Sequence, residues 1–226
     1  MDFPQQLVDG YRSFRQTRLP VEQDRYRELA ETGQQPDVMV IGCCDSRVSP
    51  EVIFNARPGE LFVVRNVANL VPPYSPSDVV RGVSAALEFA VQALKVKHVV
   101  VLGHARCGGI RAFAEPDTPL SPGDFIGNWM ALIAPAAKAV GACGDRPRAE
   151  YLAQLERAAI VNTLANLMTF PFVRALVEGG RLQLHAAYFD VATGLMSICD
   201  PKTGIFAAVD DAQHPRSPGE DVQARA

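Results

Sequence analysis

Residues with metal-binding side chains follow two apolar segments of the chain. His104 and Cys107 stand three residues apart, and the adjacent pair Cys43-Cys44, one of which could complete three ligands, follows an earlier apolar run. Two thiolates and one neutral imidazole suit tetrahedral zinc, and three protein ligands leave the fourth position for water, which is typical of a catalytic site. An H-x-x-C pair alone more often indicates a buried cysteine beside a hydrogen-bonded histidine. The second motif, at Cys43, favours the metal site instead.

An acidic and a basic residue accompany the first cysteine. We expect Asp45 and Arg47 to lie on the same side of an extended segment that begins at Cys43. At a protein surface such an ion pair contributes little to stability. Beside a metal, the carboxylate either ligates the ion or accepts a hydrogen bond from its bound hydroxide, and the guanidinium keeps the carboxylate ionised. This position favours a chemical role for the pair.

The apolar pattern of the chain predicts the scaffold that brings these motifs together. Short β-branched runs are typical of strands buried on both faces of a parallel sheet. Such runs stand at residues 38–41, 61–64 and 99–102. Because functional groups gather beyond the carboxyl ends of parallel strands, Cys43 and His104 should face the same crevice.

The remaining elements are predicted from helical and alternating spacing. A crossover helix between the second and third strands should be capped by Ser77 or Asp78. Helical spacing also covers residues 124–140 and 148–170, whereas residues 181–187 and 195–199 look like closing strands around a Thr193-Gly194 turn.

We therefore predict one α/β domain whose central, mainly parallel sheet has four strands plus an edge strand and is flanked by helices. Residues 1–35 should form an N-terminal helical arm of two amphipathic helices broken at Pro20, with little core of its own. Residues 36–210 should form the zinc-binding catalytic domain. Residues 211–226 have almost no large apolar side chains, and we expect a mobile tail.

Composition narrows the range of partners and compartments. A net charge of -3 gives no electrostatic reason to expect nucleic acid or an anionic membrane as a partner. The first residues lack the pattern of a signal peptide, and no apolar stretch is long enough to span a bilayer. Five cysteines form an odd set, which in a reducing compartment favours metal ligands or reactive thiols over disulfides. We expect a cytoplasmic protein.

The two motifs resemble those of the β-class carbonic anhydrases, in which C-x-D-x-R precedes H-x-x-C by some sixty residues. The similarity extends over roughly residues 34–199 and is greatest to the plant-type branch. It is carried by the stretches GELFVVRNVANLVPPY, LEFAVQALKVKHVVVLGHARCGG, DFIGNW and NTLANLMTFPFV. The resemblance implies an α/β enzyme that reversibly hydrates carbon dioxide to bicarbonate and a proton. It also implies one Zn²⁺ per subunit and a homo-oligomer, at least a dimer and possibly a tetramer.

The resemblance assigns a role to each matching position. Cys43, His104 and Cys107 match the zinc ligands, and Asp45 with Arg47 matches the catalytic dyad that orients zinc-bound hydroxide toward the substrate. The substrate-binding glutamine matches Gln34, and the apolar wall, which in the family comes from the neighbouring subunit, matches Phe62 and Val67. Without the resemblance, these last three would be interpreted as a loop amide and ordinary strand core.

The chain departs from the family pattern at two functional places. Phe89 stands where plant-type members often carry a pocket tyrosine, so the pocket loses a hydroxyl. Members with a non-catalytic bicarbonate site use a tryptophan, an arginine and a tyrosine, where this chain has Val40, Arg65 and Phe89. Only the arginine survives, and we expect no such site.

Three other functions are compatible with parts of the pattern. A hydrolase of CS₂ or COS shares the fold and ligands, and the motifs near the metal barely separate it from a carbonic anhydrase. A structural zinc module would need a fourth protein ligand, for which Cys44 is the nearest thiol. Thiol redox chemistry at Cys43-Cys44 is disfavoured because adjacent cysteines form a strained pair and no C-x-x-C is present.

Overall fold

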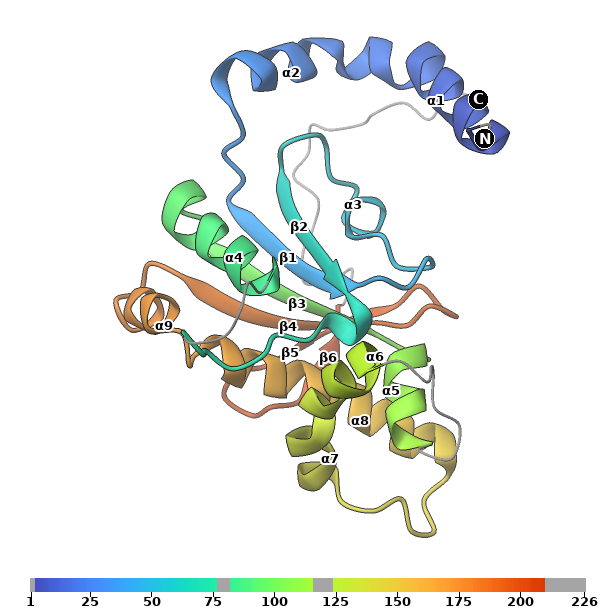
Figure 1. Cartoon of the computed structure of the whole chain (residues 1–226), viewed down its shortest axis with the longest axis vertical. Coiled ribbons are helices and arrows are strands. Elements are labelled where there is room, and N and C mark those ends of the chain that lie inside the picture. The colour runs from blue at the N-terminus through green and yellow to red at the C-terminus, as the bar shows by residue number, and fades with distance from the viewer. Residues whose placement is uncertain (1–2, 77–81, 116–123, 210–226) are drawn as a thin grey trace.

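A computed structural model describes residues 3–76, 82–115 and 124–209, and it confirms the predicted α/β fold with a mainly parallel central sheet (Figure 1). The strand order is β2-β1-β3-β4-β5-β6, in which the first four strands are parallel and the last two are antiparallel. The strands are β1 (Val38–Cys43), β2 (Leu61–Asn66), β3 (His98–His104), β4 (Gln183–Phe189), β5 (Met196–Cys199) and β6 (Phe206–Ala208).

The alternation of side chains along the central strands builds two faces of core. On one face, Met39 and Ile41 of β1 join a buried cluster with residues of the helices α4 (Gly82–Glu88), α8 (Arg148–Leu167) and α9 (Pro171–Glu178). On the other face, Val40 packs with Leu102 and with Ile53 of α3 (Pro50–Ile53). Side chains on both faces of β1 and β3 are covered by other parts of the chain. This agrees with the continuous apolar runs from which these strands were predicted.

The helices follow the predicted regions, with some changes at their ends. The predicted helix at 124–140 is divided by a 3₁₀ turn, and the one at 148–170 ends at Leu167, after which a separate helix begins at Pro171. The helices after β1 are α3 (Pro50–Ile53), α4 (Gly82–Glu88), α5 (Gly108–Ala114), α6 (Asp124–Met130), α7 (Ala134–Val140), α8 (Arg148–Leu167) and α9 (Pro171–Glu178), of which α7 packs on α8. The π-helical segment η2 (Phe89–Leu94) extends α4.

Two helices, α1 (Gln5–Thr17) and α2 (Leu19–Thr32), extend away from the sheet, and neither contains a buried residue (Figure 1). Their attachment to the body includes a hydrogen bond from the Arg25 Nε to the carbonyl of Pro58, at 3.3 Å. The predicted break at Pro20 is wrong by two residues. The helices part at Arg18, and Pro20 lies in the first turn of α2, where its missing N–H costs no hydrogen bond.

The sheet has one more strand than predicted. Strand β6 pairs with β5 and contains three residues, too few for an alternating pattern to reveal it in the sequence. The predicted cap at Ser77 or Asp78 and the predicted tail at 211–226 lie outside the described residues.

No single helix in the described part of the chain has both the length and the hydropathy to cross a membrane. Helices α8 and α9 satisfy such a criterion only when counted together, and they meet at 93°.

The close approach of α8 to β3 depends on a glycine. A side chain at Gly103 would meet Cγ1 of the buried Ile160 at 2.6 Å. Gly103→Ala should therefore lower the free energy of unfolding by about 1–3 kcal/mol through overpacking. Urea denaturation would measure this change.

The matched control is Gly10→Ala on α1, where an added methyl group meets nothing within 4 Å. This variant should be neutral, or more stable by about 0.5–1 kcal/mol, because alanine favours a helix interior. Equal destabilisation of both variants would contradict the packing described for α8.

Candidate metal centre

The three predicted ligands meet at the carboxyl edge of the sheet. Cys43 is the last residue of β1, His104 is the last of β3, and Cys107 directly precedes α5. One ligand atom from each lies within 4.8 Å of the other two, and the residues are 4%, 1% and 2% exposed. Since β1 and β3 are adjacent and parallel, with Gly42 opposite Leu102, their ends reach the same place, as the sequence predicts.

Hydrogen bonding selects the nitrogen that His104 presents to this cluster. Its Nδ1 lies 2.9 Å from the carbonyl oxygen of Ala105, so Nδ1 carries the proton and donates it there. The opposite nitrogen, Nε2, is buried and has no hydrogen-bond partner among the described residues. With Nδ1 protonated, Nε2 is the nitrogen that His104 would offer to a metal beside the two thiols.

The two sulfurs also fit a divalent cation. Cys107 donates a hydrogen bond to the Cys43 sulfur, which holds the pKa of Cys43 below its usual range, and the Ala68 N–H lies 3.4 Å from the same sulfur. The same contact and burial raise the pKa of Cys107, because a second thiolate beside the first is unfavourable. A cation between the sulfurs would stabilise both thiolates, so the donor set fits Zn²⁺.

The Asp45 carboxylate lies next to the cluster and is held by Arg47. Oδ1 accepts from Nε of Arg47 at 2.9 Å, Oδ2 accepts from Nη2 at 2.6 Å, and the same Oδ2 is 3.9 Å from His104 Nε2. These bonds keep the pKa of Asp45 well below its usual range, so the carboxylate is ionised at neutral pH. The predicted pairing of Asp45 with Arg47 beside the ligands is thus present in the structure.

Two arginines tie the ligand loops together. Arg47 Nη2 also donates to the carbonyl of Arg106, at 3.1 Å, and so connects the loop after β1 with the loop after β3. Arg65 on β2 donates to the carbonyls of Cys43 and Asp45, both at 2.8 Å. The sequence did not reveal this role of Arg65, because the backbone atoms that it contacts are twenty or more residues away in the chain.

Cys44 does not join the ligand cluster. It is exposed, whereas Cys43 is buried, because successive side chains of an extended segment point in opposite directions. In the described part of the chain, the group that could hold a metal consists of the three predicted ligands. The structure therefore offers no thiol from Cys44 as the fourth ligand that a structural zinc module would need.

The predicted substrate-binding residues fall into two places. Val67 follows β2 and packs against the cluster that contains Cys43 and Cys107. Phe62, in contrast, is the second residue of the edge strand β2 and lies opposite Met39, four residues and roughly 13 Å before the end of its strand. Within one chain, Phe62 is therefore too far from the sulfurs to form a wall beside them.

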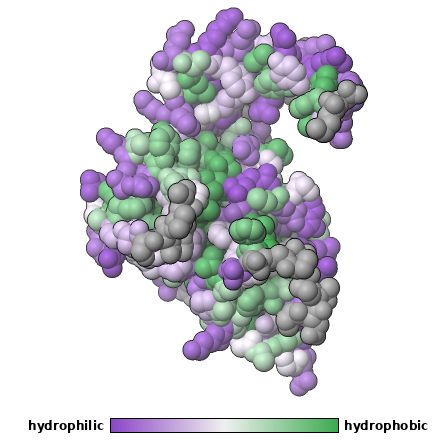
Figure 2. All heavy atoms as spheres, in the orientation of Figure 1, coloured by the Kyte–Doolittle hydropathy of each residue, from purple (hydrophilic) through white to green (hydrophobic). Residues whose placement is uncertain are grey.

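Phe89 and Gln34 lie on the same distant side. Phe89 is 49% exposed, and its ring centroid is 5.9 Å from that of Phe62. Gln34 is exposed and precedes β1, while Cys43 ends this strand, which alone spans roughly 17 Å. Figure 2 shows apolar surface over α4 and the strands beside it, beneath the projecting helices.

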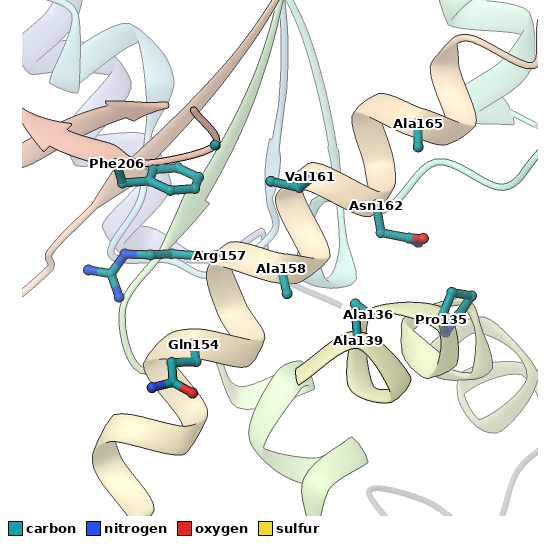
Figure 3. Close-up of a pocket in the computed structure, with 11 residues that line it drawn as sticks. Pro135, Ala136, Ala139, Gln154, Arg157, Ala158, Val161, Asn162, Ala165 and Phe206 are labelled. Atoms are coloured by element: carbon teal, nitrogen blue, oxygen red, sulfur yellow. The ribbon is translucent and has the colours of Figure 1, made fainter. Parts of the chain in front are cut away.

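Two cavities differ in their relation to this centre. One, of about 610 Å³, is lined by Asp45, Arg47 and Cys107 together with residues of α8. The other, of about 720 Å³, lies between α7, α8 and Phe206 of β6, and its wall contains none of the predicted site residues (Figure 3). The first cavity gives access to the metal centre.

Known proteins share both the sequence and this fold. A family described as "Carbonic anhydrase" matches residues 38–196. The chain is 37% identical over 210 residues to "Carbonic anhydrase" of Pseudomonas aeruginosa, covering 92% of each protein. It is similar to the solved β-carbonic anhydrase CcaA, with a TM-score of 0.84, 27% identity and coverage of 91% of this chain and 92% of the other.

A second solved structure comes from the filamentous ascomycete Sordaria macrospora and is described as one of two tetrameric β-carbonic anhydrases. The TM-score is 0.74 at 25% identity, covering 90% of this chain and 98% of the other. The matches span both motifs and nearly all of the sheet. The chain therefore belongs to the β-class carbonic anhydrase family of enzymes.

Proposed function

We propose that this chain catalyses the reversible hydration of carbon dioxide to bicarbonate and a proton, with one Zn²⁺ per chain held by Cys43, His104 and Cys107. The observation that carries the proposal is the buried three-ligand cluster, with the free Nε2 of His104 directed into it and an ionised Asp45 beside it. Three protein ligands leave room for a water, as catalytic zinc sites require.

Each residue beside the cluster has a separate task. Zinc held by the three ligands would supply a water of lowered pKa as the nucleophile. The ionised Asp45 acts only as a hydrogen-bond acceptor, and its Oδ2 lies 3.9 Å from His104 Nε2, so its role would be to accept the proton of that water and orient it. Arg47 fixes the direction of the carboxylate through its two-point contact. Val67 supplies apolar surface on the same side.

We further propose that a second copy of the chain completes the pocket with its Gln34, Phe62 and Phe89. In one chain these residues lie far from the ligands, and Phe89 remains half exposed. Helices α1 and α2 have no buried residue, which favours packing on a partner. The tetrameric assembly of the Sordaria macrospora relatives supports an oligomer of at least two chains.

Zinc content tests the ligand assignment. Purified wild-type protein should contain about one zinc per chain, and Cys43→Ser should lose most of it because a hydroxyl is a poor ligand beside a remaining thiolate. Cys44→Ser is the matched control and should retain full zinc, since this exposed thiol lies outside the cluster. Loss of zinc in the Cys44 variant alone would refute the assignment.

Turnover tests the role of Asp45. Asp45→Asn should keep zinc but lower the rate of carbon dioxide hydration by about a hundredfold or more, because the amide no longer acts as a charged acceptor. Asp37→Asn, at the opposite end of β1 and paired with Lys97 at 2.9 Å, should be as active as wild type. Unchanged turnover in the Asp45 variant would remove this residue from the mechanism.

The wild-type protein can also be assayed with COS. Sulfide release from COS that exceeds carbon dioxide hydration would indicate the related hydrolase instead.

Mixing two inactive variants tests the shared pocket. If Gln34 serves the partner's zinc, a hybrid of Gln34→Ala and Asp45→Asn chains has one complete site. Random pairing makes about half of the dimers hybrids, so about a quarter of wild-type activity should return. The assay compares co-refolded chains with each variant refolded alone. Activity that never exceeds the mean of the separate variants would show that Gln34 acts within its own chain or not at all.

A further inference from the structure

A buried carboxylate on α8 lies behind the ligand loop and belongs to none of the motifs above. Glu156 is 5% exposed. Its two oxygens accept hydrogen bonds from neutral groups: Oε1 from the Cys107 N–H at 3.0 Å, and Oε2 from the Tyr188 hydroxyl at 2.7 Å. The guanidinium of Arg157, the next residue, lies over the Tyr188 ring instead, 4.0 Å from its centroid.

Packing alone does not explain a carboxylate at this position. Burial raises the pKa of Glu156, although the Tyr188 hydroxyl and the Cys107 N–H act in the opposite direction. A buried acid is costly, and its hydrogen bonds have to offset the solvation that it loses. The two groups that Glu156 contacts should therefore explain why an acid is present at this position.

The first contact is with the backbone of a ligand residue. The loop from His104 to Cys107 contains Arg106 with a φ of 59°, a conformation that needs support from its surroundings. The Cys107 N–H precedes α5 and is buried, and Glu156 is the acceptor that the described residues give it. Without the carboxylate this N–H would lack a partner, and the loop would have to move to reach water.

The second contact and the packing of α8 fix the carboxylate itself. Ile160, one helical turn after Glu156, sits against Gly103, so this face of α8 lies directly on β3. Tyr188 on β4 holds the other carboxylate oxygen. Strands β3 and β4 and helix α8 thus set the position of Glu156 Oε1, which accepts the hydrogen bond from the Cys107 N–H.

We propose that Glu156, oriented by Tyr188, is a positioning residue that holds the backbone of Cys107 so that its sulfur is directed at the zinc. This inference rests on the proposed zinc-dependent function. The hydrogen bonds, rather than the packing of α8, would then determine how tightly Zn²⁺ is held.

The test is the zinc affinity of four variants, measured by competition with a chromophoric chelator, together with the melting temperature of each zinc-free protein. Glu156→Ala should bind Zn²⁺ about 10- to 100-fold more weakly, the usual effect of losing a group that orients a ligand. Glu156→Gln keeps an acceptor for the Cys107 N–H and can donate to Tyr188, so its affinity should remain close to wild type.

The matched control is Leu167→Ala, on the same helix and fully buried, in a cluster that does not contain Cys107. It should lower the melting temperature of the zinc-free protein while zinc affinity stays near that of wild type. If Glu156→Ala behaves in the same way, its role is structural only and the inference is overturned. A glutamine variant as weak as the alanine variant would also overturn it, because charge would then matter rather than the hydrogen bonds.

Tyr188→Phe keeps the inference testable if Glu156→Ala does not fold. Removing this hydroxyl alone should give a zinc affinity between those of wild type and Glu156→Ala. If Glu156→Ala does not fold, the affinity of Tyr188→Phe should still be measurably below that of wild type. Wild-type affinity would contradict the orienting role of Tyr188. Wild-type protein that binds no zinc would instead refute the proposed function, so the two failures are distinguishable.

Discussion

The structure depends on burying two thiols and one imidazole side by side at a single point of the sheet edge. His104 Nε2 has no hydrogen-bond partner among the described residues, and the two sulfurs share one hydrogen bond, which lowers the pKa of Cys43 and raises that of Cys107. Such an arrangement is unfavourable by itself, because buried polar atoms and adjacent thiolates both cost free energy. A divalent cation removes both penalties, which links the stability of this edge of the sheet to the metal.

Three side chains around the cluster bind the backbone of the ligand segments. Arg65 binds the carbonyls of Cys43 and Asp45, Arg47 bridges to the loop after β3, and Glu156 accepts from the Cys107 N–H. Each contact joins segments far apart in the chain. Together they connect the two strand-to-helix segments that carry the ligands, which favours a preformed metal site.

The sequence was sufficient to predict the centre but not its support. Cys43, His104 and Cys107 could be placed together because apolar strand patterns are strong and the carboxyl ends of parallel strands share one edge. Glu156 was hidden within helical spacing, although an acid on the apolar stripe of α8 was a usable signal. Strand β6 was too short to predict, and the distance of Phe62 from the ligands follows only from strand register.

X-ray absorption at the zinc edge of the loaded protein tests the central claim most directly, because it counts the atoms around the metal. The account predicts two sulfur neighbours at about 2.3 Å, and one imidazole nitrogen and one oxygen at about 2.0–2.2 Å. An oxygen neighbour that exchanges with solvent would match the open position. Three sulfurs and a nitrogen, with no oxygen, would contradict the account and indicate a closed structural site.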